Sequence, residues 1–421
     1  MAEKRIPKRS EVDKQYTWAI EDIYPTDEAW AEDLARLKAV PARIAAFKGR
    51  LSESGDTLLE FMKLSDEISV LVDSLANYAQ RKSDEDTAVS RYQAMTGQLM
   101  STYVEINSAG SFETPELIAI SDERMEELYK EQPALELYRL NLDRIRRKKA
   151  HVLSEDEEKI MALAGDALSS PETIFSMFSD ADLKFPDALD KDGNAHQVTH
   201  GSYSPLMQQS DRALRKSAFE SMYHTYDKFK NTMASTLSAQ VKSVQFYSKA
   251  RKYESSLQYA LEGNEVPVEV YTNLIEAVHN NMHYMYDYVA LRKKIMGLDE
   301  LHFYDIYAHM VDDVDMKITF EEAKETVLKA LAPMGEDYLK IMREGFENRW
   351  IDVFENEGKA SGAYSAGARV HPFVMLNHKD TLNCMFTLAH EMGHAIHSYL
   401  SNKNQPVAYS DYVIFVAEVA S

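Results

Sequence analysis

Helix-start signals follow one another along the first 180 residues, and they constrain the fold more than any other feature of this chain. Thr26, followed by Asp27 and Glu28, supplies the side-chain oxygen and the first-turn acids that begin a helix. Apolar residues then recur at helical spacing, beginning with Leu34 and Leu37. The whole chain holds only 15 glycines and 12 prolines, too few for a loop-rich β-sandwich. We therefore predict a mainly α-helical protein.

A break in the helical pattern divides the chain into three predicted parts. The turn-like sequence Asp190–Gly193 lies between two short extended segments, and this predicts a small β-hairpin. We assign residues 1–180 to a helical N-terminal region and residues 181–205 to the hairpin and linker. Helices resume in residues 206–421, which we treat as one further region.

The composition limits the partners to be expected. The chain of 421 residues has 47 Lys and Arg against 68 Asp and Glu, a formal net charge of −21. A phosphate backbone attracts basic surfaces, so nucleic acid is not an expected partner. The single cysteine, Cys384, rules out an intrachain disulfide framework and fits a reducing compartment. We find no secretory signal and no apolar run of about 18 residues, so we expect a cytoplasmic protein with no membrane partner; the oligomeric state is left open.

The segment Val370–Asn377 is predicted to be a strand beside a glycine-containing loop. Pro372 lacks an N–H group and cannot sit in the middle of a central strand, so we predict an edge strand or the start of one. The unpaired backbone groups of an edge strand can pair with an extended peptide. A purely structural edge explains the same residues.

A helix from Asp380 to about Leu400 contains the sequence that points to chemistry, His390-Glu391-Met392-Gly393-His394. Residues four apart lie one above the other on a helix, so His390 and His394 can offer two ring nitrogens to one metal ion. Glu391 lies about 100° round the helix from His390, close enough to reach a metal-bound water without being a ligand. Two surface histidines in contact with each other are the alternative interpretation.

The other residues of this helix are expected to have structural roles. An apolar stripe is predicted to be buried, consisting of Leu382, Met385, Phe386, Ala389, Ile396 and Leu400. Cys384 is interpreted as a small packed side chain. His397 shares the face of the two histidines, but a fourth protein ligand would close the site to water. We therefore interpret His397 as a residue that supports the ligands and does not bind the ion itself.

Glu418 is the candidate third ligand, because catalytic zinc takes three protein ligands and a water. Ser410 can cap a helix here, and from Tyr412 to Ala420 every residue except Glu418 is apolar. A helix that is apolar on all sides is buried, and an ionised carboxylate inside it needs a compensating cation. Zinc is such a cation; an arginine or lysine partner is the alternative.

The residues singled out above resemble the active-site region of peptidase family M3, and within it they are most similar to the oligoendopeptidase F type. The resemblance is strongest over His390–Tyr399 and Phe415–Ser421. Similar segments occur at Trp18–Tyr24, Ser83–Asp86 and Ser361–Tyr364, so the resemblance covers essentially the whole chain. It implies a multi-helix clamshell with a deep channel that admits short peptides and excludes folded proteins.

The resemblance also implies roles for individual residues. His390, His394 and Glu418 would hold one zinc ion per chain, with Glu391 as the general base. Residues 206–421 would form the zinc peptidase catalytic domain.

The strand residues receive a role in the same way. Phe373, Val374 and Met375 resemble the family's substrate-pairing edge, which lies beside the active-site helix. This agrees with the edge strand predicted from Pro372.

The C-terminal end departs from the family pattern. In the family the catalytic domain continues past the position of Ser421 and supplies further helices together with His and Tyr donors for the oxyanion. We therefore keep two hypotheses. The first is a zinc-dependent endopeptidase that hydrolyses short peptides by attack of a zinc-bound water, with Glu391 as base. The second is a catalytically inactive, truncated fragment that binds peptide or metal. A helical scaffold with an accidental motif is a third reading, and it would hold no stoichiometric zinc.

Overall fold

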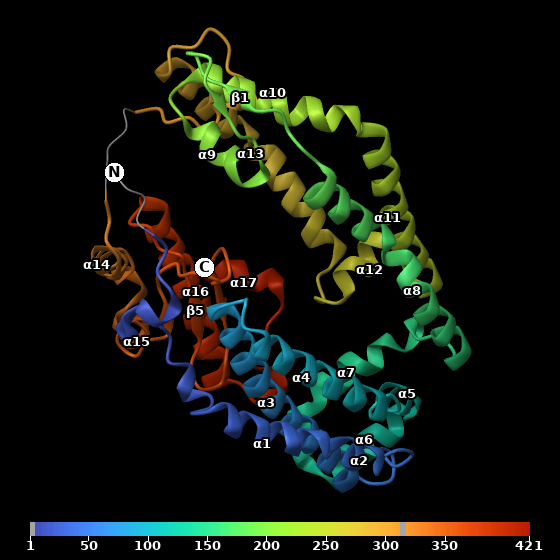
Figure 1. Ribbon diagram of the computed structural model, residues 1–421. Coiled ribbons are helices and arrows are strands. Elements are labelled where there is room, and N and C mark those ends of the chain that lie inside the picture. Colours follow the sequence, from blue (N-terminus) through green and yellow to red (C-terminus); the bar gives the residue numbers. More distant parts are fainter. Residues whose placement is uncertain (1–4, 312–316) are drawn as a thin grey trace. The chain divides into compact units, whose positions relative to one another are not determined.

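The computed structural model describes residues 5–311 and 317–421, and most of them are helical, which confirms the predicted fold class (Figure 1). The chain forms two compact units. The first combines Met1–Lys149 with Met316–Ser421, and the second is Ala150–Asp315. The segment 181–205, expected to separate two regions, lies inside the second unit.

The N-terminal part of the first unit consists of helices that follow one another closely. They are α1 (Asp27–Lys38), α2 (Val40–Ala45), α3 (Gly55–Glu85), α4 (Ser90–Ala109), α5 (Glu113–Ala119), α6 (Asp122–Glu131) and α7 (Arg139–Arg147). The hydroxyl of Thr26 accepts the backbone N–H of Ala29 at 3.3 Å, so α1 begins at the predicted cap. Short 3₁₀ turns precede or connect these helices, at Arg9–Glu11, Lys14–Tyr16, Ile20–Asp22, Pro133–Tyr138 and Lys148–His151.

The C-terminal part of the first unit holds the remaining helices and a small sheet. The helices are α14 (Phe320–Ala330), α15 (Glu336–Glu347), α16 (Leu382–Asn404) and α17 (Ile414–Ala420), with 3₁₀ turns at Ala332–Met334 and Val407–Tyr409. The strands are β3 (Ile351–Asp352), β4 (Tyr364–Ala366) and β5 (Phe373–Met375).

The sheet places β5 in its centre, with β3 parallel on one side and β4 antiparallel on the other. Val374 pairs with Ile351 of β3 and with Ser365 of β4. The prediction that this segment is an edge strand is therefore wrong. Pro372 comes one residue before the strand, so its missing N–H is not needed by either neighbour.

Both faces of β5 are covered, and this explains its apolar sequence. Phe373 and Met375 point into a core formed with the N-terminal helices, whereas Val374 and Leu376 belong to a second core formed with α14, α15 and α16. A strand buried on both faces has a continuous apolar run instead of an alternating one. The strand joins the two cores and fixes the position of α16.

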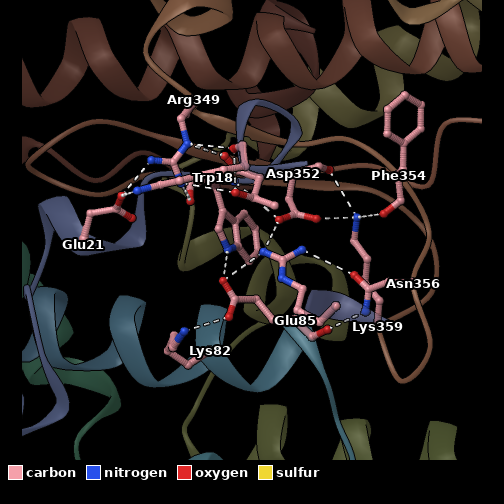
Figure 2. A network of polar contacts seen from close by, with 12 residues as sticks. Trp18, Glu21, Lys82, Glu85, Arg349, Asp352, Phe354, Asn356 and Lys359 are labelled. Atoms are coloured by element: carbon pink, nitrogen blue, oxygen red, sulfur yellow. Dashed lines mark hydrogen bonds and ion pairs between the residues drawn. The ribbon is translucent and has the colours of Figure 1, made fainter. Parts of the chain in front are cut away.

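A buried network of charges ties the N-terminal segment to this sheet (Figure 2). The carboxylate of Asp352 on β3 lies 2.5 Å from Arg9 Nη2 and 2.7 Å from Lys359 Nζ. The side chains of Asp352 and Lys359 are each only 1% exposed. Lys359 Nζ also donates to the carbonyl oxygens of Phe354 at 2.7 Å and Leu376 at 2.5 Å.

A second acid of the same network belongs to α3. Glu85 accepts hydrogen bonds from the Trp18 indole N–H at 2.8 Å, from Arg9 at 3.0 Å and from Lys82 at 2.8 Å. Because Arg9 bridges Glu85 and Asp352, the network joins three segments that are far apart in the sequence. Each carboxylate is paired with a cation, as buried charges require.

The second unit is helical apart from one hairpin. Its helices are α8 (Glu155–Ser176), α9 (His200–Gln208), α10 (Arg212–Lys228), α11 (Lys230–Ala250), α12 (Ser256–Glu262) and α13 (Val268–Ile295), with a π-helical turn at Met177–Asp182 and a 3₁₀ turn at Phe303–Asp305. The hairpin pairs β1 (Ala188–Leu189) with β2 (Ala195–His196) around the predicted turn. Across the described part of the chain, no helix has both the length and the apolar character needed to cross a bilayer.

Candidate metal centre

The helix α16 carries the two histidines, but it is oriented differently from the prediction. Its cap is Thr381, whose hydroxyl accepts the N–H of Cys384 at 3.2 Å, whereas Asp380 has a positive φ of 54° and lies outside the helix. The buried face consists of Leu388, Glu391, Met392, Gly393, Ala395, Ile396 and Ser398. Of the predicted apolar stripe only Ile396 is buried, and Leu382, Phe386 and Leu400 are exposed.

His390 and His394 stand one turn apart and converge. Their Nε2 atoms lie 3.2 Å apart, and their rings meet edge to face with centroids separated by 4.7 Å. The pKa of His394 is lowered, chiefly by burial, which favours the neutral form that binds metals. The two rings thus present their Nε2 atoms to one point.

Glu418 reaches the same point from α17. Its carboxylate oxygens lie 3.7 Å from His390 Nε2 and 3.7 Å from His394 Nε2. All three candidate ligand atoms lie within 4.8 Å of one another. The structure therefore brings together the three residues that the sequence proposed as ligands.

The surroundings of Glu418 differ from the prediction. Its side chain is 60% exposed, and in α17 only Ala417 is buried. The helix begins at Ile414, with Val413 and not Ser410 at its cap position. The expectation of a buried helix is therefore wrong. Apart from Ala417, the apolar residues of α17 are exposed or only partly buried, so the argument from burial does not apply to Glu418.

The donor set itself fits a zinc ion. Two imidazole nitrogens and one carboxylate are the ligand types of catalytic zinc. Among the described residues, the two imidazoles are the ion-pair partners of the Glu418 carboxylate, which also accepts a hydrogen bond from the Ser421 hydroxyl at 3.2 Å. The arginine or lysine partner that would have explained Glu418 without a metal is not found among these residues.

Gly393 permits the close approach of α16 and α17. A Cβ atom at this position would lie 2.5 Å from the carbonyl oxygen of Ala420 and 2.9 Å from Ser421 Cα. Any larger residue would push the end of α17 away from α16. The glycine between the two histidines is therefore part of what brings Glu418 to them.

The side chain of Glu391 is buried beside the ligands, with 7% of its surface exposed. Burial raises its pKa, and the negative charge of Glu418 acts in the same direction. His390 and a backbone hydrogen bond from Ser365 on β4 partly oppose this effect. A carboxyl group with a raised pKa is suited to accept and release a proton near neutral pH.

His397 packs away from the three candidate ligands. Its ring stacks on Tyr412 with centroids 3.7 Å apart, and the Tyr412 hydroxyl lies 2.7 Å from the hydroxyl of Ser398. Ser401 donates to the carbonyl oxygen of Ser410 at 2.6 Å. These contacts hold the segment before α17 against α16, so His397 helps to position the segment that leads to Glu418.

The sheet contributes an element that the sequence interpretation missed. Because β5 is central, the strand next to α16 that has one unpaired side is β4. Ser365 of β4 contacts the buried Glu391 through its backbone. The glycine-containing loop that precedes Tyr364 was the available signal, since it marks the start of an extended segment.

The sequence matches two family models. Residues 205–421 match Peptidase family M3, and residues 116–185 match Oligopeptidase F. The oligopeptidase PepF of Bacillus subtilis is 42% identical over all of this chain and 64% of its own length. The group B oligopeptidase PepB of Streptococcus agalactiae is 37% identical over 98% of this chain and 69% of its own length. This chain belongs to peptidase family M3.

Solved structures of the M3 type have the same fold. A putative peptidase from Chlamydophila abortus superimposes with a TM-score of 0.88 at 32% identity, covering 99% of this chain and 70% of that one. The oligoendopeptidase F of Enterococcus faecium gives a TM-score of 0.62 at 30% identity, covering 94% of this chain and 64% of that one. The M3 family is one of metallopeptidases, in keeping with the ligand set of this chain. The chain spans about two thirds of the length of the curated relatives named above.

Proposed function

We propose that this protein is a zinc-dependent endopeptidase that hydrolyses short peptides. The observation that carries the proposal is the convergence of His390, His394 and Glu418 to within 4.8 Å, with Glu391 buried beside them. The names of the relatives, which are oligopeptidases and oligoendopeptidases, support short peptides as the substrate class.

One zinc ion per chain would be held by His390, His394 and Glu418. When bound, zinc polarises a carbonyl group and lowers the pKa of a water molecule to about 7. His397 supports this site by its stacking on Tyr412, which fixes the segment that leads to Glu418. Loss of that stacking would loosen the carboxylate and leave both histidines in place.

Glu391 acts as the general base. Its carboxylate takes a proton from the attacking water and passes it to the nitrogen of the leaving amine. Such a positioned group contributes about 10²–10⁴-fold to the rate. The raised pKa of Glu391 favours the first transfer, because its buried surroundings stabilise the protonated carboxyl.

The substrate backbone pairs with β4. The role first assigned to Phe373, Val374 and Met375 requires unpaired backbone groups, and β5 is paired on both sides. The free side of β4 offers such groups next to α16. Main-chain pairing at Ser365 would place an extended peptide beside Glu391.

Two further assignments accompany this function. We propose residues 206–421 as the catalytic domain, supported by the M3 match that begins at residue 205. The single Cys384 supports a reducing, cytoplasmic location.

The test combines metal content with peptide hydrolysis. The purified chain should hold one zinc ion, and it should cleave an internally quenched fluorescent peptide until a chelator removes the metal. Glu391→Gln should keep its zinc and lose about 10²–10⁴-fold in kcat. Its matched control is Glu355→Gln, which changes a partly exposed acid of the same unit whose partner is Lys379.

Each other outcome has a distinct meaning. Unchanged turnover in Glu391→Gln overturns the base assignment. Stoichiometric zinc without turnover in the unsubstituted chain favours a fragment that only binds metal or peptide. Absence of zinc after loading removes the proposal altogether.

A further inference from the structure

A pocket of about 730 Å³ adjoins the candidate metal centre within the first unit. One wall is made by His390, Glu391 and Gly393 of α16. The opposite wall comes from α15 and the turn before it, and its lining includes Leu331, Met334 and Tyr338. The pocket is therefore continuous with the residues assigned to catalysis.

Two large apolar side chains that line this pocket are exposed. Phe386 lines it from the turn of α16 before His390, and its side chain is 63% exposed. Met334 lines the other side and is 58% exposed. A large apolar side chain left in water contributes favourable free energy when a ligand covers it. Apolar residues gathered at one hollow beside a catalytic group are typical of a ligand subsite.

A second pocket shows that this apolar character is local. It has about 490 Å³, and its lining includes Ser365 and Gly367 at β4, together with Arg369 and Asp73. Arg369 donates to the hydroxyl of Ser410 at 2.9 Å. Its polar lining shares no residue with that of the apolar pocket. A peptide lying along β4 would thus meet different chemistry in the two hollows.

We propose that Phe386, Met334 and Tyr338 form a specificity subsite that takes a large apolar side chain, such as that of Phe or Leu, from a residue flanking the scissile bond. Because the pocket is continuous with the residues assigned to catalysis, a side chain bound in it belongs to a peptide whose backbone reaches His390 and Glu391. The subsite rests on the proposed peptidase function and adds its substrate class, peptides with a large apolar residue at the cleavage point.

The first experiment follows cleavage of paired peptides. An octapeptide of alanines with one central Phe is compared with the all-alanine version, both carrying the same solubilising ends, and mass spectrometry locates the cut. The Phe peptide should be cut at a bond next to its Phe, with kcat/KM about 10-fold or more above that of the alanine peptide. Phe386→Ala and Met334→Ala should reduce this preference about 10-fold.

Leu382→Ala is the matched control for Phe386→Ala. Leu382 is also an exposed apolar residue of α16, one turn earlier, and it does not line the pocket. The control should keep the full preference. Equal loss of preference in Leu382→Ala, or an unchanged preference in both pocket variants, overturns the subsite.

A binding experiment separates the subsite from the peptidase function. Zinc-loaded Glu391→Gln protein should bind the Phe peptide about 10-fold more tightly than the alanine peptide, measured by calorimetry, and Phe386→Ala in this background should abolish the difference. Selective binding without turnover in the unsubstituted chain would retain the subsite and reject the enzyme. Turnover with no selectivity in rate or binding would retain the enzyme and reject the subsite.

Discussion

Two clusters of charged residues in the first unit contain acids that face basic side chains, and they differ in how those acids are compensated. Asp352 is buried, and its oxygens lie 2.5 Å from Arg9 and 2.7 Å from Lys359. Glu418 is mostly exposed, and its oxygens lie 3.7 Å from two imidazoles. The first acid has permanent cations at contact distance, whereas the second faces two imidazole rings.

This difference separates a cluster that maintains the fold from one that is prepared to bind a ligand. The negative charge of Asp352 is balanced by cations of the chain itself. The backbone carbonyls of Phe354 and Leu376 accept further hydrogen bonds from Lys359. Around Glu418 two nitrogens and a carboxylate converge, and among the described residues no arginine or lysine pairs with the carboxylate. The first arrangement is complete without a ligand, and the second becomes complete with a metal cation.

The largest effect on stability is expected at Asp352. Asp352→Asn leaves the buried Lys359 without its carboxylate and leaves Arg9 with the carboxylate of Glu85 alone, and breaking a buried pair in this way costs about 3–5 kcal/mol. The free energy of unfolding, from urea titration, should fall by that amount. Replacing the pair together, as Asp352→Leu with Lys359→Met, should recover much of the loss. A small effect of Asp352→Asn would contradict the assignment of this cluster to stability.

The second effect is expected on metal affinity, at Glu418. Residues that only orient ligands change affinity by about 10–100-fold, so loss of a direct ligand in Glu418→Gln should cost at least about 100-fold in zinc affinity. The free energy of unfolding of the metal-free protein should change by less than about 0.5 kcal/mol, since the side chain is exposed. Competition with a coloured chelator measures the affinity.

The control for this substitution is Asp411→Asn, an exposed acid in the segment before α17. It should leave zinc affinity unchanged. Loss of stability in Glu418→Gln without loss of affinity would place Glu418 in the same class as Asp352 and remove the contrast between the two clusters.

Features of the site that arise within one helix could be predicted from the sequence better than features that depend on contacts between different segments. The convergence of His390 and His394 follows from local helix geometry, which a spacing of four specifies. The approach of Glu418 depends on Gly393 and on the stacking of His397 with Tyr412, contacts that join different segments. The sequence was enough to propose His390 and His394 as partners of Glu418. It could not predict that Glu418 is exposed, because exposure depends on which parts of the chain pack around α17.

The strand prediction failed for a related reason. Pro372 was taken as evidence for an edge, but whether β5 is central depends on β3, whose residues Ile351 and Asp352 give no strand signal of their own. The apolar run of β5 on both faces was the better indicator, since it predicts a strand covered on both sides.

The prediction for Phe386 also failed because it used a local pattern alone. Helical periodicity assigned this residue to the core, and it is exposed at the pocket. The mainly helical fold class was predictable because many local helix signals along the sequence indicate it together.

The smallest expected effect concerns an ion pair at the margin of the Asp352 cluster, and it varies with pH. Glu21 lies beside Arg349 (Figure 2), at a distance of 2.7 Å, and it lies 3.2 Å from Lys14. Partial burial opposes ionisation, but the hydrogen bonds, foremost the one from Arg349, prevail and lower the pKa of Glu21 to about 2.

A pKa lowered by folding stabilises the native state above the unfolded value near 4.5, and this contribution is lost as the pH falls to about 2. Because the side chain is 41% exposed, the contribution at pH 7 should be below about 1 kcal/mol. Glu21→Gln should therefore destabilise the protein slightly at pH 7 and by nothing at pH 2; the control is Glu32→Gln, which changes an exposed acid of α1. Thermal unfolding of the two variants across this pH range measures the difference, and an effect of Glu21→Gln that grows as the pH falls would contradict the direction of the shift.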